Sequence, residues 1–285
     1  GYFKQHGLDV TLVPHTSAKS SLLDLFNGTI QISHVTETPV VYALMDTSYI
    51  PGNYVPPFQI FADMVYSSET QKIIARKDHG ISEPLDIVGK KVALFEGTSI
   101  DFFLDSFLLE HQISRNEFQT VNMNPSQQLD AILNGEIDVA ITWEPYASFI
   151  QQELGENATY LDTELTYSTL CLSVTLDSYA QANQDVLVSY LNSIVAAQEF
   201  MHENPDYSRK LFAQKTGVPV NVIESIWSEI DFELSLSERM LSLIEEQARW
   251  MIRNNEADTT MQDMKHFVNF APMEDVHPRG ITVIR

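Results

Sequence analysis

One short pattern occurs twice in this chain and constrains its fold more than any other feature. Residues 22–38 read LLDLFNGTIQISHVTET and residues 129–145 read LDAILNGEIDVAITWEP, and the two Asn-Gly pairs lie 107 residues apart. Each copy predicts a helix that ends at Asn-Gly, then a short buried strand, then a glutamate at the carboxyl end of that strand. The glutamates are Glu37 and Glu144. We therefore expect two related α/β halves.

Strand and helix signals alternate around both copies. The apolar pattern predicts strands at 8–13, 30–35, 58–66, 71–76, 90–95, 118–123, 137–142 and 169–175. It predicts helices at 17–27, 100–111 and 126–133, and a helical C-terminal part with helices at 186–203, 206–215, 221–228 and 238–254. This alternation is typical of an α/β fold with mostly parallel sheets and flanking helices.

The two copies differ in what precedes them. A strand at 90–95, a Gly97-Thr98-Ser99 turn and a helix come before the second copy, whereas only residues 1–6 come before the strand at 8–13 in the first. We expect an N-terminal strand, its loop and most of a helix to be missing upstream of Gly1. A signal peptide would lie in the same missing part.

The composition excludes several classes of function. A formal charge of −22 disfavours binding to nucleic acids and to anionic membranes, because both are negatively charged. The single cysteine excludes a disulfide framework, and the eight histidines form no HxxxH or HExxH pattern, so we expect neither metal nor cofactor. With 44% hydrophobic residues and a length above that of one ordinary core, the chain is expected to fold as two lobes.

Four segments together resemble a known family. GYFKQHGLDV at 1–10, LFNGTIQIS at 25–33, the strand–GTS–helix unit around 97–99 and NGEIDVAITWEP at 134–145 are similar to periplasmic substrate-binding proteins of the sulfonate/nitrate/thiamine-precursor type. The resemblance implies a type II binding-protein fold with two crossover strands and a ligand cleft between the lobes. It places residues 1–67 and 168–285 in lobe 1 and residues 68–167 in lobe 2, with hinges near Tyr66-Ser67-Ser68 and Thr166-Tyr167.

The same resemblance sets the functional expectation. It implies a monomeric, periplasmic or otherwise extracytoplasmic receptor that is not an enzyme and that delivers a small polar solute to an ABC permease. Ligands of open α/β sheets bind beyond the carboxyl ends of the strands. That rule selects ten candidate ligand-binding residues: Ser17, Thr36, Glu37, Thr38, Tyr66, Thr98, Ser99, Phe102, Trp143 and Glu144.

Within this set, three chemical roles can be distinguished. Thr98 and Ser99 begin a helix and are expected to donate hydrogen bonds to an anionic group, or else only to cap the helix. Glu37 and Glu144 are expected to face the cleft from opposite lobes and to favour an amino-bearing ligand. Trp143 is expected to stack on a planar ligand. The expected solute is therefore a nitrogen heterocycle such as an aminopyrimidine, or a zwitterion.

Two alternatives remain open at this point. The tail FVNFAPMEDVHPRGITVIR resembles segments that join sensor domains to a fused signalling domain, such as a histidine kinase or a diguanylate cyclase. The fungal thiamine-pyrimidine synthases share the fold and are enzymes, but they are cysteine-rich, and this chain has one cysteine. The sensor is thus the principal alternative to the transport receptor.

Overall fold

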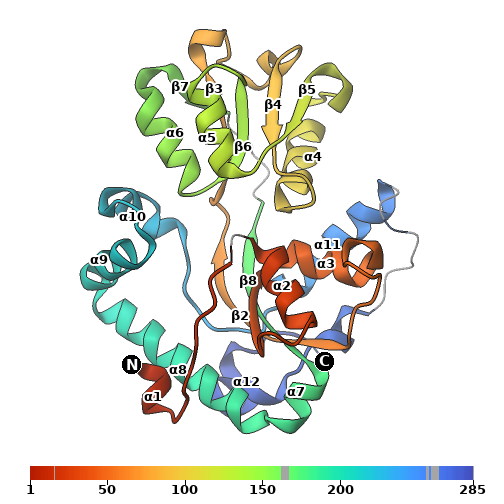
Figure 1. The fold of residues 1–285 in the computed structure, drawn as a ribbon, viewed down its shortest axis with the longest axis vertical. Helices are drawn as coiled ribbons and strands as arrows, with labels where there is room; N and C mark the ends of the chain where they lie inside the picture. The colour runs from red at the N-terminus through yellow and green to blue at the C-terminus, as the bar shows by residue number, and fades with distance from the viewer. Residues whose placement is uncertain (16, 162–166, 255–256, 258–262, 285) are drawn as a thin grey trace. The chain divides into compact units, whose positions relative to one another are not determined.

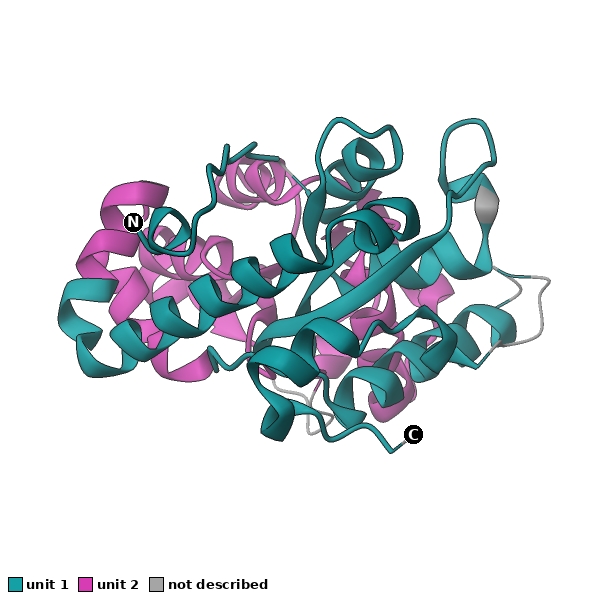
Figure 2. Ribbon diagram, turned by 90° about the horizontal axis from the view of Figure 1, so that it is seen from below, with its two compact units in different colours: residues 1–66, 169–208, 231–285 teal, residues 67–168, 209–230 magenta. Residues whose placement is uncertain are grey.

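The chain divides into two compact units (Figure 2). The structure, a computed structural model, describes residues 1–15, 17–161, 167–254, 257 and 263–284. Unit 1 comprises Gly1–Tyr66, Thr169–Ser208 and Asp231–Arg285, and unit 2 comprises Ser67–Ser168 and Arg209–Ile230. The expected division differs from this at Ser67, Ser168 and residues 209–230, all of which we assigned to lobe 1. The expected hinge residue Thr166 lies outside the described residues.

Unit 1 is built on a three-stranded sheet with the strand order β1-β8-β2. β1 pairs with β8 in the antiparallel sense, with Ser33 opposite Val174. Helices α2 and α3 pack on β1 and β8, α11 packs on α3, and α1 and α12 pack on the long helix α8 (Figure 1). The elements are α1 (Tyr2–Gln5), α2 (Ala18–Phe26), β1 (Ile32–Thr36), α3 (Glu37–Met45), β2 (Phe58–Ser67), β8 (Thr169–Leu176), α7 (Asp177–Ala182), α8 (Gln184–Glu203), α11 (Glu238–Arg253) and α12 (Ala271–Val276).

Unit 2 is built on a five-stranded sheet with the strand order β5-β4-β6-β3-β7. β4 runs parallel to β5 and β6, whereas β3 runs antiparallel to β6 and β7. The elements are β3 (Gln71–Arg76), β4 (Lys91–Leu94), α4 (Ser99–His111), β5 (Gln119–Asn122), α5 (Pro125–Leu133), β6 (Val139–Trp143), α6 (Tyr146–Leu154), β7 (Ala158–Tyr160) and α10 (Val220–Ile226). Helix α9 (Pro205–Thr216) continues from unit 1 into unit 2.

The sheets are mixed, and the expectation of mostly parallel sheets was wrong. β3 and β8 are the strands that break the parallel pattern, because each enters its sheet directly after the chain has passed from one unit to the other. A strand that arrives without a preceding crossover helix is free to pair antiparallel with its neighbour. The α/β class itself is confirmed.

The predicted strand at 8–13 does not form. The backbone there has no regular structure, and Leu12 is 80% exposed. None of the described strands pairs with this segment. Its alternating apolar side chains therefore have no sheet to bury them, and periodicity without a hydrogen-bonded neighbour does not make a strand.

The two copies of the repeated pattern have the same local structure. α2 and β1 match α5 and β6 at both ends, each shifted by the 107 residues that separate the Asn-Gly pairs. Gly28 and Gly135 both have φ of 73°, and each closes a helix end of the Schellman type. The N–H of Thr29 bonds the carbonyl of Asp24 at 2.9 Å, as that of Glu136 bonds Ala131 at 2.9 Å.

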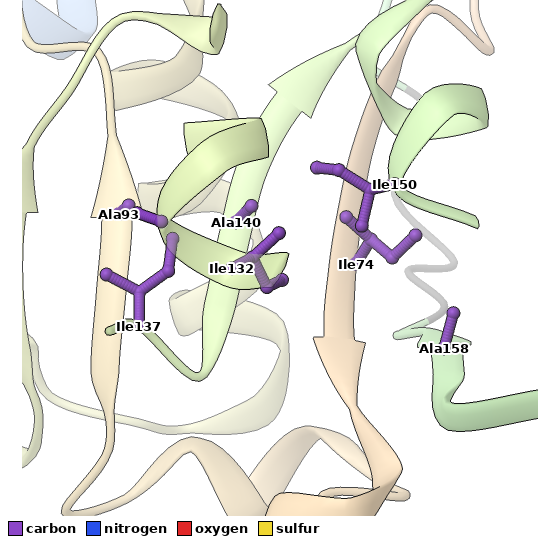
Figure 3. Packing of buried hydrophobic residues seen from close by; sticks show 8 residues of the cluster. Ile74, Ala93, Ile132, Ile137, Ala140, Ile150 and Ala158 are labelled. Carbon is purple, nitrogen blue, oxygen red and sulfur yellow. The ribbon is translucent and has the colours of Figure 1, made fainter. Parts of the chain in front are cut away.

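The core of unit 2 explains why its strands read as almost continuous apolar runs. Ile132 of α5 and Ile150 of α6 pack over one face of the sheet, against Ile74, Ala93 and Ala140 (Figure 3). Val92, Val139 and Ile73, which point to the other face, are buried as well. A sheet that is covered on both faces offers ligands only its edges and strand ends.

Candidate functional site

The candidate site of unit 2 lies at the carboxyl ends of β4 and β6. Four residues separate the end of β4 from the start of α4, and two residues separate the end of β6 from the start of α6. Gln71, the first residue of the antiparallel β3, pairs with Trp143, the last residue of β6. We call these strand ends and helix starts the unit 2 edge: Gln71, 95–102, and 143–146.

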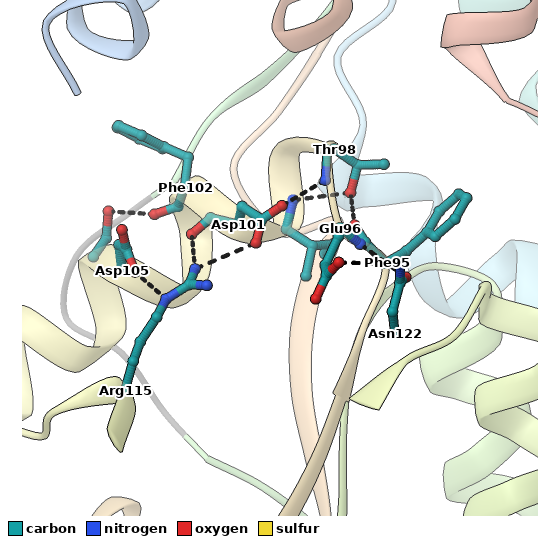
Figure 4. Close-up of polar contacts among 11 residues, drawn as sticks. Phe95, Glu96, Thr98, Asp101, Phe102, Asp105, Arg115 and Asn122 are labelled. Atoms are coloured by element: carbon teal, nitrogen blue, oxygen red, sulfur yellow. Dashed lines mark hydrogen bonds and ion pairs between the residues drawn. The ribbon is translucent and has the colours of Figure 1, made fainter. Parts of the chain in front are cut away.

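The start of α4 carries a dense set of polar contacts (Figure 4). Asp101 accepts a hydrogen bond from the Gly97 N–H at 2.6 Å. It also forms an ion pair with Arg115 at 3.3 Å. The Thr98 hydroxyl donates to the Phe95 carbonyl at 2.6 Å and accepts from the Ile100 N–H at 3.4 Å. Burial raises the pKa of Asp101, and its bonds to Gly97 and Arg115 oppose that shift. An internal carboxylate therefore already occupies part of this helix start.

Ser99 differs from Thr98 because its backbone N–H remains available to bind a ligand. Its hydroxyl accepts a hydrogen bond from the side-chain amide of Gln71 at 3.3 Å, whereas no hydrogen bond among the described residues uses its N–H. A free N–H in the first turn of a helix is a donor for an acceptor group on a ligand. Ser99 thus stays a predicted ligand-binding residue, while Thr98 has its hydroxyl committed to the turn.

Aromatic side chains line the same edge. Trp143 is half-buried, and its ring lies 6.5 Å from that of Phe95 at an angle of 44°. Phe102 is half-buried and lies 5.6 Å from Tyr167, which is itself buried. Both predicted aromatic residues therefore combine a packed side with a partly exposed side, which is the geometry that a stacking contact with a ligand requires.

Glu144 lies at the start of α6 and is coupled to a second carboxylate. Its side chain accepts a hydrogen bond from the Ser148 N–H at 3.1 Å and remains partly exposed. Burial raises the pKa of Glu229, and the negative charges of Glu144 and Glu69 raise it further, while Lys72 lowers it. Lys72 lies 3.0 Å from Glu69 and 3.9 Å from Glu229. Glu69 and Glu229 thus share Lys72, and Glu144 adds a third negative charge near Glu229.

Glu37 does not lie where the sequence led us to expect. It is the first residue of α3 and is 0% exposed. Its carboxylate accepts hydrogen bonds from the Leu170 N–H and from the Gln247 side chain, each at 3.0 Å. Thr38, beside it, is 2% exposed. Both residues belong to the interior of unit 1, so the expected pair of cleft-facing glutamates is corrected, and Glu229 is the second carboxylate near Glu144.

The other three residues of unit 1 that were predicted to bind ligand are Ser17, Thr36 and Tyr66. Ser17 caps α2 and accepts the Ser20 N–H at 3.2 Å. Thr36 precedes α3 without a side-chain capping bond and is half-buried. The ring of Tyr66 lies under the Arg239 guanidinium, 4.0 Å from it, and its backbone pairs with Asp231. Tyr66 therefore packs within unit 1, and its role in ligand binding stays a prediction.

Sequence reasoning missed Gln71 and Glu229. Gln71 is one residue in a strand of otherwise ordinary composition, and its role follows only from the pairing of β3 with β6. Glu229 lies in a C-terminal segment that we had placed in the other lobe. No local pattern marks either residue. Among the described residues, no group of three or more His, Cys, Asp or Glu side chains has an arrangement suited to a metal ion.

Two α/β units with polar helix starts at the carboxyl ends of their strands define the fold of a periplasmic binding protein. The alkanesulfonate-binding protein SsuA from Xanthomonas axonopodis pv. citri, solved with bound MOPS, has this fold, with a TM-score of 0.76 at 17% identity over 94% of this chain and 91% of that one. The chain belongs to the family described as NMT1/THI5 like, which it matches over residues 1–208. The resemblance inferred from the sequence is confirmed.

Other similar proteins define how far this identification extends. The taurine-binding periplasmic protein of Escherichia coli (strain K12) is 24% identical over 228 residues, which are 76% of this chain and 67% of that protein. The chain spans about two thirds of the length of the curated relatives it matches. A desulfurization enzyme, DSZB, solved with biphenyl-2-sulfinic acid, shares the fold with a TM-score of 0.70 at 12% identity, over 98% of this chain and 93% of that one. The fold alone thus does not separate receptors from enzymes.

Proposed function

We propose that this chain is the solute-binding component of an ABC importer, acts outside the cytoplasm, and binds a small zwitterion. The observation that carries the proposal is the unit 2 edge, which holds a half-buried indole, a free helix N–H and the Glu144 carboxylate, whose charge acts on Glu229. The chain that carries these groups belongs to the family described as NMT1/THI5 like. These groups bind and orient a solute, and none of them forms a nucleophile with an adjacent base.

The ligand class follows from charge. Among the described residues, Glu69, Glu144, Glu229 and Lys72 interact in one group, and three negative charges in it exceed one positive charge. An ammonium group would be attracted there. One similar protein is described as taurine-binding, and another was solved with bound MOPS. Taurine and MOPS each combine an amine with a sulfonate. Both facts favour a zwitterion over an aminopyrimidine, and the amino end of the solute would contact unit 2.

The sensor alternative has lost the feature that suggested it. The C-terminal tail forms part of unit 1, since Val268 bridges Ile60 of β2 and Ile281 bridges Leu236. Met273 and Val283 of the tail are buried. The tail is therefore explained by packing, and no described feature favours a signalling role over a transport role.

Isothermal titration calorimetry tests the proposal directly. The folded chain is titrated with taurine, MOPS, ethanesulfonate, ethylamine and 4-aminopyrimidine. We expect a Kd tighter than about 10 µM for at least one zwitterion, which corresponds to roughly −7 kcal/mol. Trp143→Leu should weaken that binding by about tenfold or more. Trp227→Leu is the matched control, because Trp227 is a half-buried tryptophan of unit 2 outside the unit 2 edge. If none of the five compounds gives a heat of binding, the proposal is contradicted.

A further inference from the structure

Lys19 occupies an unusual position at the start of α2 in unit 1. It is the second residue of the helix, where a positive charge opposes the helix dipole. Its ammonium nitrogen lies 3.7 Å from the centroid of the Tyr49 ring. Tyr49 in turn stacks on Tyr42, with ring centroids 4.7 Å apart and an angle of 22° between the rings. The Tyr49 ring, which is itself stacked on Tyr42, therefore contacts this cation at a helix end that disfavours it.

Among the described residues, no carboxylate forms an ion pair with Lys19. Asp46 is the acid that acts on it most directly, yet no ion pair between the two is formed. Both Asp46 oxygens are bonded to Ser48, one to its N–H and one to its hydroxyl, each at 2.9 Å. Burial lowers the pKa of Lys19, and Asp46 opposes that shift. A partly desolvated ammonium without a counter-ion is an expensive arrangement that an anion would relieve.

The helix that carries Lys19 begins near the carboxyl end of a strand in unit 1. α2 ends in the tight turn at Gly28 and packs back along β1, so that its first residues lie toward the carboxyl end of that strand. α2 also packs on α3, which begins at that strand end. Ser17 and Ser20, which cap each other in the first turn, leave Lys19 as the charged residue there. Ligands of open α/β sheets bind beyond these strand ends.

We propose that Lys19 binds the anionic group of the solute and is the charge-selecting residue of unit 1. The Tyr49–Tyr42 stack holds the ammonium in place, so that little side-chain freedom is lost when the anion arrives. The inference rests on the proposed receptor function and deepens it, because it assigns the anionic end of the solute to a named residue. The start of α4, by contrast, already holds the Asp101 carboxylate.

Taurine titrations of three variants test the role of Lys19. Lys19→Met removes the charge and is expected to weaken taurine binding by about tenfold or more. Lys19→Arg keeps the charge and should retain affinity within about threefold, although it loses the fit of a compact ammonium. Lys77→Met is the matched control, because Lys77 is an exposed lysine of unit 2, and it should bind like the parent.

A second measurement needs no variant. The Lys19 side chain is followed by NMR with ¹³C-labelled lysine, assigned from the Lys19→Arg spectrum, and a bound anion should raise its pKa relative to the free protein. If the parent binds taurine but Lys19→Met binds equally well, or the Lys19 pKa does not move, the assignment of Lys19 is wrong while the receptor function stands. If the parent binds no zwitterion, the receptor function itself fails.

Discussion

Two buried carboxylates in unit 1 hold the points at which the chain enters that unit. Glu37 accepts the N–H of Leu170, the second residue of β8, just after the chain has left unit 2. Asp63 of β2 accepts both the N–H and the hydroxyl of Ser237, at 3.1 and 2.9 Å, and the hydroxyl of Ser235. The segment 231–237 is the next point of entry. Each carboxylate thus converts a crossing segment into a hydrogen-bonded part of the core.

Removing the Glu37 carboxylate should destabilise the protein through the groups that it leaves behind. Glu37→Ala removes the acceptor of the Leu170 N–H and of one hydrogen bond from Gln247, and a buried group left unsatisfied costs about 1–3 kcal/mol. We expect the free energy of urea unfolding to fall by at least about 2 kcal/mol. Glu233→Ala is the control, since Glu233 is exposed. Equal stability of the two variants would contradict the structural role of Glu37.

Individual residues also show which features of the site could be predicted from the sequence and which could not. The repeat correctly placed Glu37 and Glu144 after matching strands. It could not reveal that Glu37 is buried, because its partner Gln247 lies 210 residues away in α11. Ser99 and Trp143 were predicted from strand ends, and they lie at one edge of unit 2. Glu229 and Lys19 became visible only when distant segments were brought together, since their significance depends on neighbours that no local pattern contains.

The repeated helix–turn–strand element predicts that the same substitution in its two copies has the same effect on stability. Gly28 and Gly135 share the same left-handed backbone conformation, and an added Cβ meets nothing within 4 Å at Gly28 and only side-chain atoms at 3.6 Å or more at Gly135. Alanine at either position should therefore cost the same backbone strain, about 1–2 kcal/mol. Urea unfolding of Gly28→Ala and Gly135→Ala measures this. A large difference between them would show that the two turns are not energetically equivalent. Gly1→Ala is the control and should cost nothing measurable.

Asp138 joins three segments of unit 2 and gives a pH prediction. It accepts the Lys91 N–H of β4 at 2.8 Å and the His79 ring at 2.6 Å. Burial favours the neutral acid, but these two bonds outweigh it and hold the pKa of Asp138 below its ordinary value of 3.8. A carboxyl group with a depressed pKa stabilises the folded state above pH 3.8, and that stabilisation is lost as the pH falls through the folded pKa.

The Asp138→Asn variant should therefore lose stability less steeply than the parent on acidification. Urea midpoints measured between about pH 5 and pH 2 detect the difference in slope. Asp130→Asn, an exposed position of α5, is the matched control and should follow the parent. The hypothesis is wrong if Asp138→Asn and the parent lose stability in parallel over this range.

For the whole molecule, ligand binding should appear in the thermal unfolding of the chain. A ligand present at 100 times its Kd stabilises the native state by about 2.7 kcal/mol, because it binds the folded chain and not the unfolded one. Differential scanning calorimetry should show that taurine raises the Tm of the chain by several degrees. If the two units unfold separately, both transitions should shift when each unit contributes to binding. A shift confined to one transition would assign the solute to that unit alone.

The sequence predicted the α/β class and most helices and strands of both units, because these depend on local periodicity and on the repeat. The family was inferred from the resemblance of four segments to known proteins. Strand direction was not predictable in the same way. β3 and β8 pair antiparallel because of where the chain enters each sheet, which is a property of its path through both units. For the same reason, the membership of residues 209–230 in unit 2 was not foreseen. Long-range topology, and not local propensity, accounts for these differences.

The path of the chain has a consequence for biosynthesis. Unit 2 needs residues up to Ile230, and unit 1 needs residues from Asp231 onward, so neither is a contiguous stretch of polypeptide. When residue 200 has just been synthesised, both cores are still incomplete, because each lacks helices that come later in the chain. The nascent protein must therefore avoid aggregation until residues 209–284 have emerged, since these residues complete both cores.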